Sequence, residues 1–298
     1  MYELVQVAEN SFYMDCPTKV GFYKISSNEV VLIDSGSDKD AAKKVKKILD
    51  GQGWNLKAIY NTHSHADHIG GNQYLQNQTK CKIYSPGIEQ AFTAHPILEP
   101  TMLYGGHALK ELHNKFLMAK ESSAEYLTKE KLPEGLEILN LPGHCYDMVG
   151  FRTKDDVIFL ADCLSSEETI EKYQIGFVYD VQAYIDTLYM VKNLDAKCFI
   201  PSHAPETNEI VALAQLNIDK TLHVAEVIKD LLKEPMTFEE LLSKIFERFE
   251  LTMTLPQRFL IGATVKSYLT YLKNKSQVDY CFKDNKMLWH SSVNAIAG

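Results

Sequence analysis

The sequence predicts an α/β fold in which sheets are covered by helices, followed by a smaller and mainly helical C-terminal region. Three observations support this prediction. The first 35 residues alternate short β-rich runs with turn residues. Helical and strand-like segments then alternate up to about residue 203. The rest of the chain holds three long amphipathic segments and a short β-like pair. Such alternation is typical of layered α/β and α+β domains.

The opening runs predict an antiparallel sheet, because they are rich in β-branched and aromatic residues and are separated by turn residues. The segment SDKDAAKKVKKILDGQG then predicts a helix with a Ser or Asp cap, one apolar face and a terminating glycine. A second helix is expected at 69–76. The expected strands are 2–7, 11–14, 20–25, 29–34, 57–60, 81–85, 136–141, 148–153, 156–161 and 198–203.

Residues 95–131 interrupt this alternation with a Gly-Gly turn and a segment rich in Leu, Phe and Met. We interpret them as a partly helical insertion. An excursion of this kind beside a catalytic loop often forms a wall or cap of the substrate site. The alternative is a structural helix that packs on the sheet.

The C-terminal region differs from the rest in pattern and charge. Long helices are expected within 206–234, 237–249 and 255–275, the second starting with a Thr237–Glu240 capping box, and two short strands follow. Three helices and a hairpin resemble a small winged-helix domain. From Lys220 onward the chain has 11 Lys and Arg against 9 Asp and Glu. We therefore expect a catalytic domain over 1–205 and a winged-helix-like domain over 206–298.

Composition limits the classes of function. The formal net charge of −8 argues against a protein that binds polyanions over its whole surface. No basic segment with an apolar run opens the chain and no membrane-spanning apolar stretch occurs, so we expect a soluble, cytoplasmic protein without a membrane partner. The six cysteines are scattered without a CxxC pair, which predicts neither a disulfide framework nor a cysteine-only zinc site.

The loop NTHSHADHIGG at 61–71 crowds four metal-competent side chains together. A catalytic ion of the zinc type takes three protein ligands and keeps one position for water, so four groups are too many for one open site and too few for two. Further ligands are expected at or after the ends of apolar strands. The candidates from the loop and from the later strands are His63, His65, Asp67, His68, His144, Asp162 and His203.

This set of residues resembles the signature of the metallo-β-lactamase superfamily, an HxHxDH loop with a later His, Asp and His and an early Asp. The resemblance covers roughly residues 1–205 and implies a four-layer αββα sandwich. It implies that His63, His65 and His144 hold one metal ion, that Asp67, His68 and His203 hold a second, and that Asp162 bridges them. Asp34 in LIDSG would orient the loop from outside the metal shell; alternatively, it is an ordinary turn aspartate.

Two divalent ions held in this way would activate a bridging hydroxide and polarise a carbonyl or phosphoryl oxygen. We expect Asp34, Asp67 and Asp162 to take part in catalysis. Mixed histidine and carboxylate ligands suit Zn²⁺ best, with Fe or Mn as alternatives. No GxSxG elbow marks a serine nucleophile.

The predicted activity is hydrolysis of a small carboxylic ester, thioester or lactone. The Asp-bridged ligand set looks like that of the glyoxalase II, lactonase and phosphodiesterase branches. The alternative is a phosphodiesterase or endoribonuclease of the same fold, whose C-terminal domain contacts nucleic acid through basic residues of its third helix. That domain could instead form a homodimer or cap the active site. A small-molecule substrate is the expected partner.

Overall fold

The computed structural model describes residues 2–292 and contains two main sheets. Seven strands follow one another in chain order across the first sheet: neighbours from β1 to β4 are antiparallel, and neighbours from β4 to β7 are parallel. The predicted antiparallel opening is therefore confirmed. The strands of this sheet are β1 (Glu3–Gln6), β2 (Ser11–Asp15), β3 (Val20–Lys24), β4 (Glu29–Ile33), β5 (Asn55–Tyr60), β6 (Lys82–Ser85) and β7 (Ala124–Tyr126).

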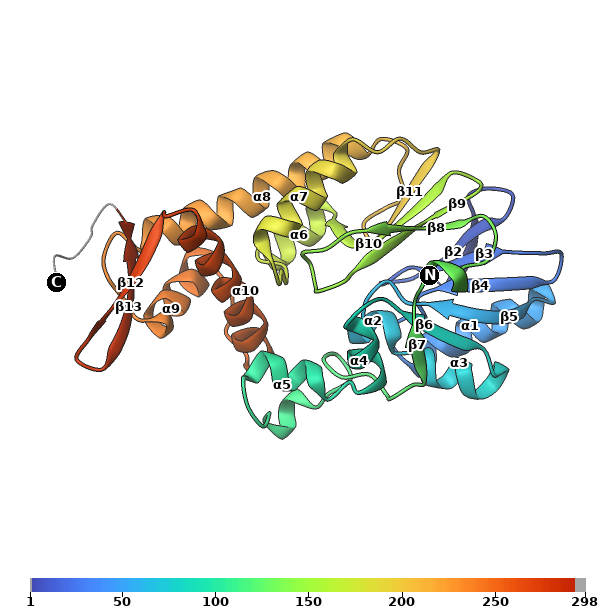
Figure 1. Cartoon of the computed structure of the whole chain (residues 1–298), viewed down its shortest axis with the longest axis horizontal. Coiled ribbons are helices and arrows are strands. Elements are labelled where there is room, and N and C mark those ends of the chain that lie inside the picture. The colour runs from blue at the N-terminus through green and yellow to red at the C-terminus, as the bar shows by residue number, and fades with distance from the viewer. Residues whose placement is uncertain (1, 293–298) are drawn as a thin grey trace.

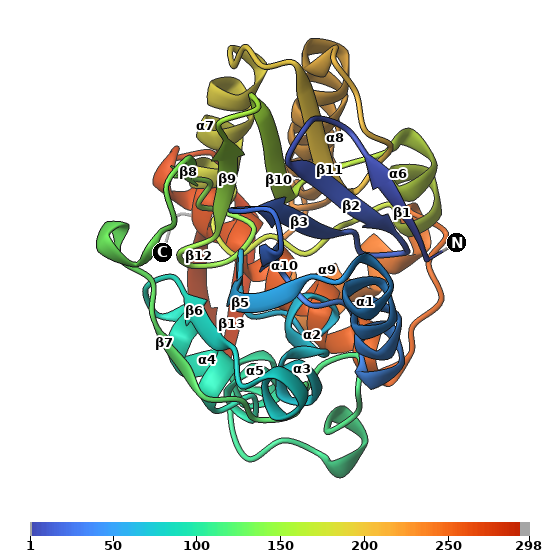
Figure 2. The same cartoon turned by 90° about the vertical axis from the view of Figure 1, so that its right-hand side faces the viewer.

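The second sheet has four strands in the order β11-β10-β9-β8, with β10 and β11 parallel and the other pairs antiparallel. The strands are β8 (Leu136–Asn140), β9 (Val149–Thr153), β10 (Val157–Ser165) and β11 (Cys198–His203). The two sheets face each other, as Figure 2 shows. Between them lies a core to which alternate residues of each strand contribute, such as Val31 and Ile33 from β4 and Phe151 and Phe159 from the second sheet.

The other residues of the same strands face the outer helices. Val30 and Leu32 pack with Val45 and Leu49 of α1 on the outside of the first sheet. The two sheets and their outer helices form the αββα sandwich, so the predicted fold class is confirmed (Figure 1). The helices are α1 (Lys39–Gln52), α2 (Ala66–Ile69), α3 (Asn72–Thr79), α4 (Glu89–Ala94), α5 (Leu98–Tyr104), α6 (Glu167–Tyr173), α7 (Val181–Lys192), α8 (Ile210–Leu231), α9 (Phe238–Arg248) and α10 (Leu255–Asn274).

The C-terminal region contains the three predicted helices and a hairpin of β12 (Val278–Lys283) and β13 (Lys286–Ser291). The Thr237–Glu240 capping box is present at the start of α9. One continuous apolar core joins β10 and α7 to α8, α9 and α10. The division into domains at 205/206 stays a prediction. None of the helices within residues 2–292 is both long and apolar enough to cross a membrane.

Residues 95–131 differ from the expectation in two ways. Their helix is α5, which ends at Tyr104 and is capped by Gly105 in the left-handed conformation. The Leu- and Phe-rich stretch 107–118 after it has only the single 3₁₀ turn Lys110–Leu112. Their last part returns to the first sheet as β7, which pairs in parallel with β6. The segment therefore leaves the sandwich and rejoins it.

Candidate metal centre

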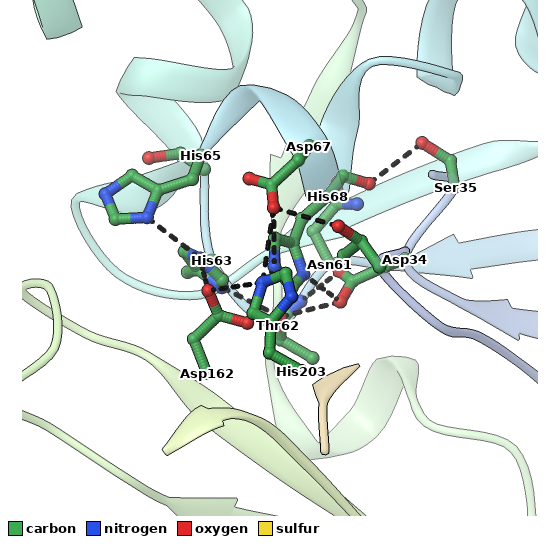
Figure 3. Close-up of polar contacts among 12 residues, drawn as sticks. Asp34, Ser35, Asn61, Thr62, His63, His65, Asp67, His68, Asp162 and His203 are labelled. Carbon is green, nitrogen blue, oxygen red and sulfur yellow. Dashed lines mark hydrogen bonds and ion pairs between the residues drawn. The ribbon is translucent and has the colours of Figure 1, made fainter. Parts of the chain in front are cut away.

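All seven predicted ligand residues meet at one edge of the sandwich, where loops of both sheets come together (Figure 3 labels six of them). His63 and His65 lie on the loop after β5, whereas Asp67 and His68 belong to the short helix α2 that this loop enters. The prediction that all four residues lie on a loop is wrong for Asp67 and His68. The other three come from the second sheet: His144 from the turn between β8 and β9, Asp162 from β10 and His203 from the end of β11.

The first group joins His63, His65, His144 and Asp162, each of which offers one ligand atom. Nδ1 of His65 lies 3.1 Å from Nε2 of His63 and 3.0 Å from Nε2 of His144. Oδ2 of Asp162 lies 3.6 Å from Nε2 of His144 and 4.0 Å from Nε2 of His63. Three imidazole nitrogens and one carboxylate oxygen therefore converge on one point.

The second group joins Asp67, His68, His203 and again Asp162. Nε2 of His203 lies 3.1 Å from Oδ2 of Asp162 and 3.3 Å from Oδ2 of Asp67. Nε2 of His68 lies 2.8 Å from Oδ1 of Asp162. Asp162 is the one residue shared by both groups, which is the arrangement that a bridging carboxylate requires.

Asp34 orients two of the histidines from behind, directly and through Thr62. Its Oδ2 lies 2.7 Å from Nδ1 of His68 and accepts a hydrogen bond of 2.7 Å from the hydroxyl of Thr62. Because the Thr62 hydroxyl donates its hydrogen bond to Asp34, its oxygen accepts a hydrogen bond from Nδ1–H of His63 at 3.0 Å. These contacts engage Nδ1 of both rings outside the site and turn Nε2 toward it, where it would bind a metal ion.

Two backbone carbonyls bind Nδ1 of the two histidines that come from the second sheet, His144 and His203. Nδ1 of His144 donates to the carbonyl of Phe177 at 3.0 Å, and Nδ1 of His203 donates to the carbonyl of Pro17 at 3.1 Å. The neighbouring Thr18 hydroxyl donates to Oδ2 of Asp67 at 2.9 Å. Outer partners of this kind fix the tautomer and direction of metal ligands.

Unusual backbone positions aim the carboxylates. Asp34 has a φ of 62° and Ala161, directly before Asp162, has a φ of 52°, both in the left-handed region that side chains rarely adopt. The β10–β11 register shifts on both sides of Ala161, which marks an irregularity at this point. Asp162 therefore lies inside β10, at the irregularity, and not at the strand end that the sequence predicted.

Gly70 and Gly71 bring α2 against the loop that carries Asp34. An added Cβ at Gly71 would lie 2.2 Å from the carbonyl oxygen of Ser35, and one at Gly70 would lie 2.2 Å from that of Ser37. Both glycines have helical dihedral angles, with φ of −60° and −87°. Close backbone approach therefore explains both glycines.

The donor set fits divalent metal ions. Nε2 of His68 and Oδ1 of Asp162 are both buried and close together, yet neither makes a hydrogen bond within residues 2–292. Buried polar atoms without a partner are uncommon and costly. A cation between them would satisfy both atoms, and imidazole nitrogens with carboxylate oxygens are ligands of Zn²⁺, Fe and Mn.

Burial and neighbouring charges shift the pKa values of the histidines in opposite directions in the two groups. Burial, with neighbouring histidines adding to it, lowers the pKa of His144 to about 4 and lowers that of His63 well below its usual value. Burial also opposes charge on His203, but the Asp162 and Asp67 carboxylates outweigh it and raise the pKa of His203 to about 10. The first group thus holds its imidazoles neutral, which is the form that binds metal.

The sequence did not indicate several side chains around the site. Thr18 and Thr62 support ligands, and Glu89 accepts hydrogen bonds from the backbone and hydroxyl of Ser64. Glu99 of α5 faces His65. Of these, only Thr62 lies inside the NTHSHADH motif, which could have pointed to it. Thr18, Glu89 and Glu99 lie on segments without a motif.

A polar cavity of about 420 Å³ opens beside His203, the one member of the second group that lines it. Its volume falls within the range of small-molecule sites. The walls come from β2 and the loop after it, the start of α6, and the end of β11 with the loop that follows. They include Tyr13, Lys19, Ser166, Thr169, His203 and Glu206. Nζ of Lys19 donates to the carbonyl of Ala204 at 2.5 Å and so ties two of these walls together.

Comparisons with known proteins agree with this geometry. The family model of the metallo-β-lactamase superfamily matches residues 14–203. A hydroxyacylglutathione hydrolase of Nitrobacter hamburgensis is 29% identical over 130 residues, 43% of this chain and 42% of that protein. One of Blochmanniella pennsylvanica is 28% identical over 172 residues, 56% of this chain and 55% of that protein. The chain thus matches about half the length of these curated relatives.

Solved structures share the fold over nearly the whole chain. A metallo-β-lactamase family protein of Thermus thermophilus covers 92% of this chain and 93% of its own, with a TM-score of 0.72 and 17% identity. A β-lactamase domain protein of Burkholderia ambifaria covers 97% of this chain and 93% of its own, with a TM-score of 0.69 and 14% identity. From the family match, the fold and the grouped His and Asp residues, we conclude that this chain belongs to the metallo-β-lactamase superfamily.

Proposed function

We propose that this protein is a dinuclear metal-dependent hydrolase. One observation carries the proposal: seven His and Asp side chains form two four-residue groups that share Asp162. His63, His65 and His144 would hold the first ion, and Asp67, His68 and His203 the second, with Asp162 on both. The buried Nε2 of His68 and Oδ1 of Asp162, which make no hydrogen bond within residues 2–292, support this assignment.

Two divalent ions bound there would polarise the scissile carbonyl of a substrate and activate water for attack on it. The protein's own groups prepare the site for this chemistry. Asp34 and Thr62 hold the rings of His63 and His68 in one tautomer, and Thr18 holds Asp67 by a hydrogen bond. Such outer contacts keep the ligands in place without rearrangement during the reaction.

The proposed substrate is a small carboxylic ester, thioester or lactone, with a thioester favoured. The curated relatives are named for hydrolysis of an acylated glutathione. The 420 Å³ cavity beside His203 gives space for a small substrate, and its polar walls suit a polar one. We assign Zn²⁺ as the metal because mixed histidine and carboxylate ligands suit it, with Fe and Mn as the alternatives.

A substrate panel tests the proposal. Purified protein with measured metal content would be assayed against acyl thioesters, lactones, bis-nitrophenyl phosphate and single-stranded RNA. We expect hydrolysis of thioesters or lactones that disappears after chelation and returns with Zn²⁺. A matched sample stripped of metal and left unreconstituted serves as the control. Activity on RNA alone would overturn the proposed substrate class and favour the ribonuclease alternative.

A further inference from the structure

His65 is the one histidine of the two groups whose far nitrogen is not yet explained. The other four face the site through Nε2, and each has a partner on Nδ1. His65 faces the site through Nδ1, so its Nε2 points away. Oε1 of Glu99 lies 3.9 Å from this Nε2.

Glu99 lies in an enclosed place, where burial and the nearby Glu89 raise the pKa of its carboxyl group to about 8. It is 8% exposed, and with His65 it lines a cavity of only about 10 Å³ whose walls also include Met102, Tyr146 and Phe177. The second buried carboxylate there, Glu89, is engaged by the backbone and hydroxyl of Ser64. Within residues 2–292 the Glu99 carboxyl group makes no hydrogen bond. Its oxygens are therefore available to accept one from His65.

The helix that carries Glu99 is held from the far side by the C-terminal region. Leu103 of α5 and Leu112 belong to a small apolar cluster against which Phe259 and Leu255 of α10 pack. The rings of Tyr104 and Phe259 lie 5.1 Å apart. Figure 1 shows α10 running from the C-terminal hairpin down to α5. The position of Glu99 therefore depends on the 95–131 segment and on α10 together.

We propose that Glu99 is a positioning residue for His65. Its carboxyl group accepts a hydrogen bond from Nε2–H of the His65 ring and so directs the Nδ1 lone pair of that ring to the first metal ion. The inference rests on the proposed metal site, but not on the substrate class. A carboxylate opposite Nε2 favours the tautomer protonated there and makes Nδ1 a better ligand. The 3.9 Å between Oε1 of Glu99 and Nε2 of His65 is longer than a hydrogen bond, so the proposal includes a small rotation of the Glu99 side chain toward the ring.

The test compares Glu99→Gln with wild type and with Glu111→Gln, a change at an exposed glutamate of the same segment. Zn²⁺ affinity at each site would be measured by competition with a chromophoric chelator, and Co²⁺ spectra would report the coordination of each ion. We expect Glu99→Gln to weaken one site by about 10- to 100-fold and to shift its Co²⁺ bands. The other site, the melting temperature of the metal-stripped protein and the Glu111→Gln variant should stay unchanged.

Two results would overturn this inference. Unchanged affinities and spectra in Glu99→Gln would show that the carboxylate does not act on His65. Weakening of both sites together with a lower melting temperature of the metal-stripped protein would show a merely structural role. If wild type itself fails to take up two ions, the proposed function fails, and this outcome is distinct from either result.

Discussion

The imidazole of His144 is buried and neutral, and this has a consequence for stability in the absence of metal. Its pKa is lowered to about 4 by burial, whereas a histidine in the unfolded chain has a pKa of about 6.5. Between about pH 6.5 and pH 4, His144 is therefore protonated in the unfolded chain but stays neutral in the folded protein. The stability that His144 contributes is present above pH 6.5 and is lost as the pH falls towards 4.

We predict that metal-stripped His144→Gln loses less stability than wild type when the pH falls from 7 to 5. Over this pH range the effect of this one group is on the order of 2 kcal/mol. Chemical denaturation of both proteins at the two pH values measures it, and His223→Gln, at an exposed histidine of α8, is the control. Equal losses in wild type and His144→Gln would contradict the prediction.

At the residue scale, the sequence predicted the seven candidate ligands but few of their supports. The ligands are His and Asp residues, four of them at the fixed spacing of the HxHxDH motif, so they can be recognised in a single sequence. The partners of His144 and His203 are backbone carbonyls of Phe177 and Pro17, and any residue type supplies a carbonyl. Glu99 comes from a segment without a motif, so only the folded structure brings it to His65.

At the element scale, Gly71 ties α2 to the loop that carries Asp34. We predict that Gly71→Ala destabilises the protein by about 1–3 kcal/mol or more, because the new Cβ would overlap the Ser35 carbonyl, which is backbone and cannot move freely. Metal affinity should fall with it, since Asp34 and α2 would shift apart.

Gly51 near the end of α1 is the matched control. An added Cβ there meets nothing within 4 Å, so Gly51→Ala should stabilise the helix by about 0.5–1 kcal/mol. Thermal and chemical unfolding of both variants, with a metal titration, tests the pair. A Gly71→Ala variant as stable as Gly51→Ala would show that close approach is not the reason for this glycine.

Elements with regular patterns were predictable and the irregular ones were not. The long helices α8, α9 and α10 and the hairpin after them match the predicted segments, because each buries one apolar face. The three-residue strand β7 is too short to show a period, and it is stabilised by pairing with β6. The site irregularity at Ala161 also has no sequence signal, since alanine gives no hint of a left-handed residue.

At the scale of the whole molecule, the proposed boundary at 205/206 crosses one continuous apolar core. Leu164 and Leu188 of the sandwich share this core with Ile218 and Ile228 of α8. We predict that a chain of residues 1–205 does not unfold cooperatively and does not bind metal with the affinity of the full chain. Circular dichroism melting and a Zn²⁺ titration measure both properties. A cooperative, metal-binding 1–205 fragment would show that the two parts fold independently.

The metal content of wild type and Asp162→Ala tests the central claim most directly. Both proteins would be stripped, reconstituted with Zn²⁺, freed of excess metal and analysed by elemental mass spectrometry against protein concentration. Because Asp162 is shared by both four-residue groups, we predict two ions per chain in wild type and at most one in Asp162→Ala. One ion or fewer in wild type, or two retained in Asp162→Ala, would contradict an Asp162-bridged dinuclear centre.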